Sequence, residues 1–142
     1  MKKFLGGLKI QHQFATVDAH GQIGRVERVN RTIQDGANAA MITCGADQRW
    51  YLHAVLHFCH VRNRLPDLED GKSRLELAGC GVQDVTLLYP FMCRVIGTTT
   101  HSKGKPSGEN YHFLGYSSDH HAAFKLLKWG SDRMVVRGRP IV

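Results

Sequence analysis

The feature that most constrains the fold is a helical segment at residues 47–63 that is apolar on nearly every side. Asp47 is a typical helix N-cap, and Leu65-Pro66 is a typical helix end. The apolar positions are Trp50, Tyr51, Leu52, Ala54, Val55, Leu56, Phe58 and Val61. Only His53, His57 and His60 interrupt this surface. Because a helix that is apolar almost all round has to be buried, other elements must pack against it.

A second helix is predicted directly before this one. Apolar residues recur at helical spacing, at Val26, Val29, Ile33, Ala37, Ala40, Met41 and Cys44. The opposite edge carries a polar ridge made of Glu27, Arg31, Gln34 and Asn38. Cys44-Gly45 predicts the end of the helix, since glycine accepts the left-handed conformation found at helix ends. Upstream, residues 4–16 fit a strand and residues 18–22 fit a loop.

The hydrophobic pattern changes in the second half of the chain. Residues 67–90 fit a connector rich in Asp, Glu and Gly, with a short helical turn around 73–78. Short β-branched or aromatic runs then follow, at 91–96, 111–116, 122–129 and 133–137. Such runs, separated by Gly, Pro, Ser and Asn, are typical of a small barrel or a curled sheet. The expected fold class is therefore α+β, with the helices first and a small β unit second.

The charge of the chain indicates an anionic partner. Its 142 residues include 19 Lys and Arg against 12 Asp and Glu, a formal net charge of +7. Residues 1–34 and residues 101–142 each carry +4, whereas residues 35–100 carry −1. Two basic ends favour contact with a polyanion such as nucleic acid. A solvated surface is the alternative for any single lysine.

The cysteines and the hydropathy narrow the class of protein. Cys44, Cys59, Cys80 and Cys93 are widely spaced and form no C-x-x-C pair, which argues against a zinc knuckle or a redox motif. The apolar run after Met1 is broken at Lys9, too early for a signal peptide. No apolar stretch approaches the length of a membrane span. These features predict a soluble protein of a reducing compartment.

The sharpest local motif is Gln-x-Gly-x-x-Glu-Arg-x-Asn-Arg-Thr at residues 22–32. Glu27 can serve as a ligand of a divalent metal if other carboxylates reach it, and the neighbouring Arg and Asn side chains can hold a phosphate backbone. The alternative is structural. In that interpretation Glu27 is an acid in the first helical turn that complements the helix dipole and pairs with Arg31.

This motif resembles the third-carboxylate segment of copia-type retrotransposon integrases, members of the Asp-Asp-Glu recombinase group. Further segments are similar to the same family in the same order. They are residues 4–14, Trp50-Tyr51, Ala54-Val55, Asn63-Arg64-Leu65-Pro66, Gly71-Lys72-Ser73, Glu76-Leu77, Asp84, Leu88, Phe91, Cys93 and Phe113-Leu114-Gly115-Tyr116-Ser117. The last of these resembles the signature of the Src-homology-3-like module that follows the integrase core. The resemblance thus extends over nearly the whole chain.

The resemblance implies an architecture and a function. Residues 1–66 would be an incomplete ribonuclease-H-like core remnant (one strand and two helices), 67–90 a connector, and 91–142 a small Src-homology-3-like β-barrel. The parent family is a metal-dependent polynucleotidyl transferase and endonuclease involved in DNA integration. Its active site needs two aspartates on earlier strands, and we expect this chain to begin after them. Since two-metal catalysis needs several carboxylates to hold ions roughly 3.5–4 Å apart, a single glutamate is insufficient.

The resemblance also assigns site residues and partners. Glu27 would be the catalytic carboxylate and metal ligand. Nucleic-acid-binding residues would be Gln22, Arg25, Arg28, Asn30, Arg31, Lys103 and Lys105. The intact parent enzyme would use Mg²⁺ or Mn²⁺, and we expect this fragment to bind neither. The expected partner is DNA, both element ends and target, without a membrane. A homo-oligomer or association with the rest of the polyprotein is expected, in an intracellular and, if functional, nuclear location.

Two other clusters have a functional and a structural interpretation each. His53, His57 and His60 could bind a metal through i, i+4 spacing, but the pattern favours a polar seam on a buried helix. The basic, Gly-rich loop 101–108 could contact phosphates, with Tyr111, Phe113 and Tyr116 as stacking surfaces. Its alternative is a flexible hairpin loop, with those aromatic residues in the core. The pair His120-His121 fits a solvated turn.

Two rival functions remain open. The chain could be a small basic β-module that mediates protein interaction, with Glu27 in a structural role. It could also be an enzyme that works with a partner supplying the aspartates. Because the sheet that would cover helix 47–63 in the parent fold is missing, we expect exposed apolar surface around Trp50, Tyr51 and Phe58.

Overall fold

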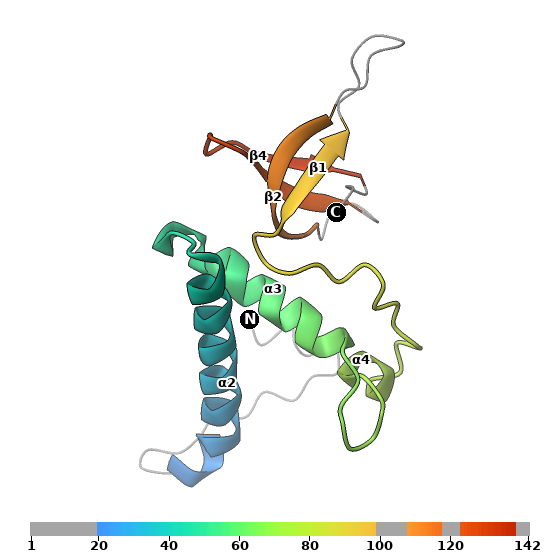
Figure 1. Ribbon diagram of the computed structural model, residues 1–142. Coiled ribbons are helices and arrows are strands. Elements are labelled where there is room, and N and C mark those ends of the chain that lie inside the picture. Colours follow the sequence, from blue (N-terminus) through green and yellow to red (C-terminus); the bar gives the residue numbers. More distant parts are fainter. Residues whose placement is uncertain (1–19, 99–107, 118–122, 139–142) are drawn as a thin grey trace, which may run out of the picture. The chain divides into compact units, whose positions relative to one another are not determined.

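The computed structural model describes residues 20–98, 108–117 and 123–138, with side chains from residue 24 onward except that of Thr98 (Figure 1). Its helices are α2 (His20–Cys44), the 3₁₀ turn η1 (Gln48–Trp50), α3 (Tyr51–Arg64) and α4 (Arg74–Leu77), and its strands are β1 (Arg94–Thr98), β2 (Gly108–Tyr116), β3 (Phe124–Lys128) and β4 (Met134–Arg137). The chain divides into two units, Met1–Thr32 and Ile33–Val142, with the boundary inside α2. The strand expected at residues 4–16 lies outside the described residues.

Helix α2 begins earlier than its apolar pattern indicates. It starts at His20, so the predicted loop at 18–22 overlaps the helix and Gly24 lies inside it. Glu27 is therefore in the second turn, and the first turn contains no acidic residue, so the expected helix-dipole contact of a first-turn carboxylate is wrong. The helix tolerates Gly24 because one interior glycine costs only about 1 kcal/mol relative to alanine. The end is as predicted: Gly45 has φ 64° and follows the last helical residue, Cys44.

The apolar helix forms as predicted from its cap to its end. The backbone N–H of Arg49 donates to Asp47 Oδ1 at 2.9 Å, which caps η1, and the chain continues directly into α3. After Arg64, Leu65 turns to an extended conformation ahead of Pro66. The Leu65 N–H still donates to Val61 O at 2.9 Å, so the last turn of the helix is closed.

Within the second unit, α2 and α3 pack closely through small residues. Ala37 of α2 and Ala54 of α3 are both fully buried. A Cβ built on Gly36 would lie 2.1 Å from the Phe58 ring, so only glycine allows this approach. Trp50, Tyr51 and Phe58 are each half-buried, and the most exposed apolar residues of α3 are instead Leu52 and Leu56, at 65% and 54%.

This close approach makes a stability prediction with an internal control. Gly36→Ala should lower the free energy of unfolding by about 1–2 kcal/mol, because displacing the Phe58 ring outweighs the gain in helix propensity. Gly24→Ala should leave stability unchanged or raise it by up to about 1 kcal/mol, since a Cβ there meets nothing within 4 Å. Urea denaturation followed by circular dichroism measures both. Equal stabilisation by the two substitutions would contradict this packing.

The strands form one antiparallel sheet in the order β1-β2-β3-β4. All four predicted strands are present, so the α+β class is confirmed. The expected closed barrel is wrong: β4 pairs with β3, β1 pairs with β2, and the described strands leave the sheet open. The register shifts between Phe113 and Gly115, and Gly115 has φ 147°, a conformation that favours glycine. The irregularity therefore lies in β2, between the two positions, Phe113 and Gly115, that pair with neighbouring residues of β3.

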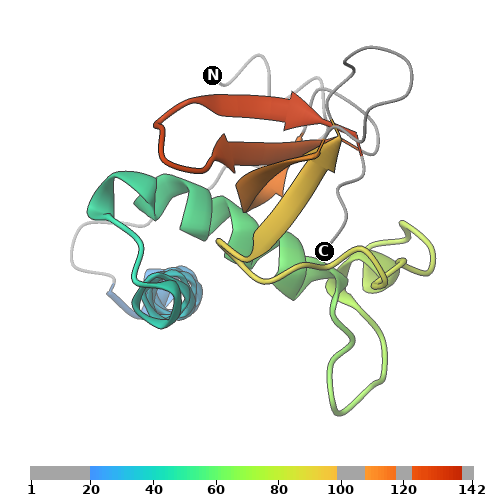
Figure 2. The same cartoon turned by 45° about the horizontal axis from the view of Figure 1, so that its top comes forward.

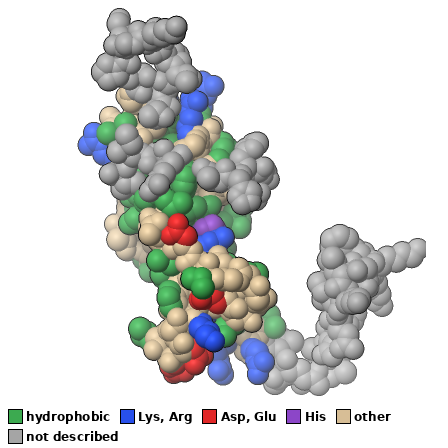
Figure 3. Space-filling model, turned by 90° about the vertical axis from the view of Figure 1, so that its right-hand side faces the viewer, with side chains coloured by type: hydrophobic (Ala, Val, Ile, Leu, Met, Phe, Trp, Pro, Cys, Tyr) green, Lys and Arg blue, Asp and Glu red, His purple; other side chains and the backbone are tan. Residues whose placement is uncertain are grey.

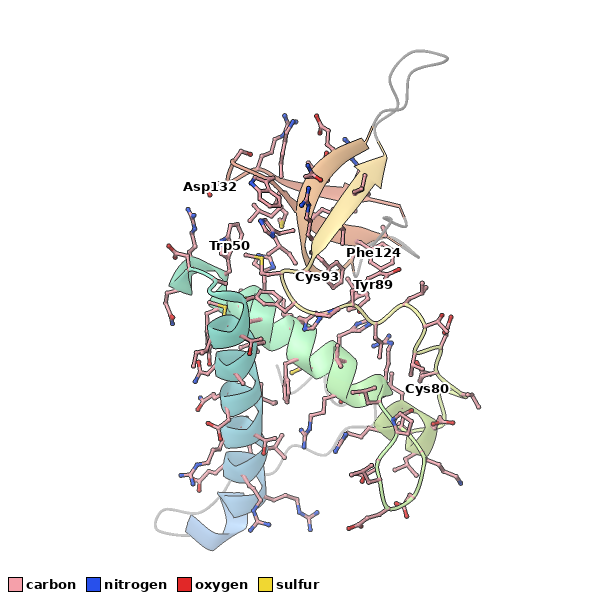
Figure 4. All side chains as sticks on the ribbon, viewed as in Figure 1. Trp50, Cys80, Tyr89, Cys93, Phe124 and Asp132 are labelled. Atoms are coloured by element: carbon pink, nitrogen blue, oxygen red, sulfur yellow. The ribbon has the colours of Figure 1, made fainter. Side chains whose placement is uncertain are left out.

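Each face of the sheet has its own apolar cluster. One face carries Val95, Tyr111, Phe113, Phe124 and Leu126, all at most 2% exposed. Tyr89 and Cys93 pack against this cluster, close to Phe124 (Figure 4). The other cluster joins Leu114 and Leu127 of the sheet to Ala37, Met41, Ala54 and Phe91. Helix α3 runs along the sheet at this second cluster (Figure 2). Tyr111 and Phe113 are therefore core residues, and the stacking role considered for them is wrong.

The predicted connector is partly ordered by its own hydrogen bonds. Ser73 begins α4 with a capping box: the Glu76 N–H donates to Ser73 Oγ at 3.1 Å, and the Ser73 N–H donates to Glu76 Oε2 at 2.7 Å. This matches the helical turn predicted around 73–78. At the end of the connector, the Tyr89 N–H donates to the Tyr116 hydroxyl, which in turn donates to Leu87 O. Tyr116 thereby ties the connector to β2.

Candidate nucleic-acid interface

The predicted basic motif lies on the first half of α2. Arg25, Arg28 and Arg31 are exposed. Gly24, Glu27, Arg28 and Arg31 line one shallow hollow of about 230 Å³, because residues three and four apart share a helix face. Asn30 is exposed but does not line this hollow. The structure therefore brings together two of the predicted arginines with Glu27. Gln22 is within α2, its side chain outside the described part, and Lys103 and Lys105 lie outside the described residues.

Glu27 has no further metal ligands among the residues that the structure describes. No group of three His, Cys, Asp or Glu side chains there could hold a metal ion, and the side chains that share the hollow with Glu27 are two arginines. The residues in this part of the chain therefore do not fit a divalent-metal centre. Glu27 and Arg31 are also not among the ion pairs of the described residues, so the predicted pair is not formed.

Three basic residues elsewhere in the described chain are paired with carboxylates, unlike the arginines of α2. Arg49 Nη1 lies 2.8 Å from Asp132 Oδ2, Arg74 Nη2 lies 3.7 Å from Asp67 Oδ2, and Lys128 Nζ lies 2.9 Å from Glu109 Oε1. Each of these cations faces a carboxylate. On the face drawn in Figure 3, Lys and Arg side chains are scattered among acidic and apolar ones. Basic character alone thus does not mark a site there. Arg28 and Arg31 are distinguished by sharing one hollow while forming no ion pair among the described residues.

The three histidines of α3 face the sheet. His57 Nε2 lies 2.8 Å from the Tyr89 carbonyl oxygen, which only accepts, so Nε2 carries the proton. The His60 ring stacks on Tyr116 with 3.7 Å between centroids and 7° between planes. His53, His57, His60 and Tyr116 line a small hollow of about 50 Å³. These contacts favour the polar seam predicted for the histidines. They also show that Tyr116, considered above as a stacking surface for bases, is covered by His60.

Burial keeps these histidines neutral. Desolvation lowers the pKa of His60 to about 4, and the positive charge of Arg64 acts in the same direction. Desolvation also lowers the pKa of His57, opposed by its hydrogen bond to Tyr89, and that of His53, helped by Lys125. In each case the uncharged ring is the form that packs between α3 and β2.

A further group of polar and aromatic side chains, which sequence reasoning missed, lies on the sheet. Arg94 of β1 and His112 of β2 are directly paired in register. The Trp129 ring stacks on His112 with 5.0 Å between centroids and 26° between planes, and the Arg94 guanidinium carbon lies 5.0 Å from the Trp129 centroid. The signal was the alternation of Arg94, Asn110 and His112 with buried neighbours, but a single sequence gives no strand register. We call Arg94, Asn110, His112 and Trp129 the tryptophan platform.

A larger hollow of about 460 Å³ lies between the η1 segment and the turn after β3. Trp50 and Asp132 both line it and are labelled in Figure 4. The ion pair between Arg49 and Asp132 spans its rim. Because these charged groups already pair with each other, the hollow offers little to select a charged ligand.

Comparison of the chain with protein-family models, with curated proteins and with solved structures finds no match. Within the described residues, no helix has both the length and the apolar character that crossing a membrane requires.

Proposed function

We propose that this chain is a nucleic-acid-binding part of a copia-type retrotransposon integrase, and that it contributes DNA contacts to DNA integration without itself supplying a catalytic centre. The proposal joins the resemblance of its motifs with the arrangement of its charges. Glu27 would occupy the position of the third carboxylate, while the arginines around it contact the phosphate backbone of DNA. In the intact parent enzyme, Glu27 would hold Mg²⁺ or Mn²⁺ jointly with other carboxylates, which are not among the described residues.

The observation that carries the proposal is the exposure of the α2 arginines without a carboxylate partner in the described part of the chain. Arg28 and Arg31 share one hollow, and neither is among the ion pairs formed by the described residues. An arginine already paired with a carboxylate must give up that partner before it binds a phosphate. An arginine without one has no such cost, and its planar guanidinium matches phosphate oxygens geometrically.

The test is the binding of duplex DNA as a function of salt. We expect log K to fall linearly with the logarithm of salt concentration, with a slope of about −0.9 for each phosphate contacted. A fluorescently labelled duplex titrated at several salt concentrations measures this slope. Absence of binding at low salt would contradict the proposal and favour the rival function, a small basic module that contacts proteins.

A further inference from the structure

The tryptophan platform is held in place before any ligand arrives. Arg94 Nη2 donates to Asn110 Oδ1 at 3.3 Å, and His112 Nδ1 lies 3.2 Å from the Met92 carbonyl oxygen. Trp129 is anchored at its backbone, whose N–H donates to Asn110 O at 3.1 Å. Its side chain rests against His112 and Arg94, yet Trp129 remains 51% exposed. A fixed ring with half of its surface open can stack with one more planar group at low entropic cost.

The formal charge of the platform's own residues is positive, because Arg94 is the charged one among them. The described strands contain a single carboxylate, Glu109, which points to the opposite face of β2 from Asn110 and His112. There Glu109 binds Lys128 Nζ at 2.9 Å and accepts from the Tyr111 hydroxyl at 2.7 Å. Two further carboxylates, Asp47 and Asp132, line the hollow that His112 also lines, and both pair with Arg49. Arg94 therefore supplies the formal charge of the platform.

This combination selects a class of ligand. Arg94 over the ring disfavours a cationic ligand such as a lysine side chain, because it already takes the cation-binding position and would repel a second positive charge. A nucleotide fits better, since its base can stack on Trp129 while its phosphate is attracted to Arg94. Bases inside a duplex are stacked on each other and present no free face. The platform thus favours unpaired bases.

We propose that the tryptophan platform binds single-stranded nucleic acid by stacking one base on Trp129, with Arg94 attracting the adjacent phosphate. This rests on the proposed function in that it assumes a nucleic-acid partner, and it adds a second site with a different substrate preference. Duplex contacts belong to Arg28 and Arg31, whereas unpaired nucleotides belong to Trp129.

The experiment titrates the full chain with an oligothymidylate of about eight nucleotides at low salt and follows tryptophan fluorescence. Trp50→Phe serves as the background, so that Trp129 is the one emitting tryptophan. We expect quenching on binding. In this background, Trp129→Ala should weaken binding of a labelled oligothymidylate roughly 5- to 150-fold, and Trp129→Phe should weaken it less. Duplex binding should stay unchanged in both variants.

Each outcome separates the two proposals. If the chain binds duplex DNA but oligothymidylate does not quench its fluorescence, the platform is overturned and the proposed function stays intact. The same holds if Trp129→Ala binds oligothymidylate as tightly as the Trp50→Phe background does. Quenching by a proline-rich peptide instead of oligothymidylate would also overturn it, in favour of a protein ligand. If the chain binds neither duplex nor single-stranded DNA, both the platform and the proposed function are overturned. Because quenching is read on the native Trp129 ring, the result stands even if Trp129→Ala fails to fold.

Discussion

Replacing Phe113 with alanine is expected to lower the free energy of unfolding by about 3–5 kcal/mol, the usual cost of removing a fully buried phenylalanine. Phe113 is 0% exposed. Its ring contacts Tyr89 of the connector, Tyr116 of β2, Phe124 of β3 and His57 of α3. One side chain thus holds together the sheet, the connector and the long helix. Since small domains have a total stability of about 5–15 kcal/mol, this loss is large.

Urea denaturation of the purified protein measures the loss, and Leu52→Ala is the matched control. Leu52 is also a large apolar residue on an element of the second unit, but it is 65% exposed, so its truncation should cost less than about 1 kcal/mol. Similar losses for the two variants would contradict the assignment of Phe113 to the core.

Acidification is expected to destabilise the contact between α3 and the sheet. The pKa of His60 is about 4 in the folded protein, against 6.5 for an ordinary histidine, and the pKa of His57 is also lowered. The unfolded chain therefore binds more protons than the folded one below about pH 6.5. The buried neutral histidines therefore make their full contribution to the free energy of unfolding above about pH 6.5, and this contribution is lost as the pH falls toward about 4. Because solvent reaches part of the His60 ring, we expect a loss on the order of 1–2 kcal/mol.

The matched variant is His60→Phe. A phenylalanine keeps an aromatic ring beside Tyr116 but takes up no proton, so its stability should vary less between about pH 7 and about pH 4.5. Lys125 and Arg64 are the cations that act on these histidines, and both are kept in the variant. Melting temperatures measured across the range give the comparison. If the melting temperature of His60→Phe falls equally steeply with decreasing pH, groups other than His60 cause the loss of stability.

Local signals in the sequence predicted several helix ends. Gly45, Asp47 and Ser73 act at single positions through one backbone conformation or one side-chain hydrogen bond, so they need no knowledge of the rest of the fold. The four strands were predicted from local composition, which also needs no knowledge of the rest of the fold. The start of α2 was missed, because Gly24 and the polar residues before Val26 give no apolar period although they permit a helix.

The arrangement in space was harder to predict. Periodicity showed that α3 has to be covered, but it did not show which of its residues face the covering element. In the structure His57 and His60 face the sheet, and Leu52 remains exposed. Hydrogen bonding to the Tyr89 carbonyl and ring stacking make histidine suitable there, and no one-dimensional pattern contains those partners. The same holds for Trp129, whose neighbours come from two other strands.

The central claim is that the α2 arginines bind the DNA backbone, and the most direct measurement compares salt slopes for duplex DNA. The variant Arg28→Ala/Arg31→Ala removes two arginines that form no ion pair within the described residues. The control Arg49→Ala/Arg74→Ala removes two that already face carboxylates. The first should reduce the magnitude of the slope by about 1.8, which is about 0.9 for each phosphate that is no longer bound, while the control stays close to the unsubstituted chain. Equal slopes for the two variants would contradict the claim.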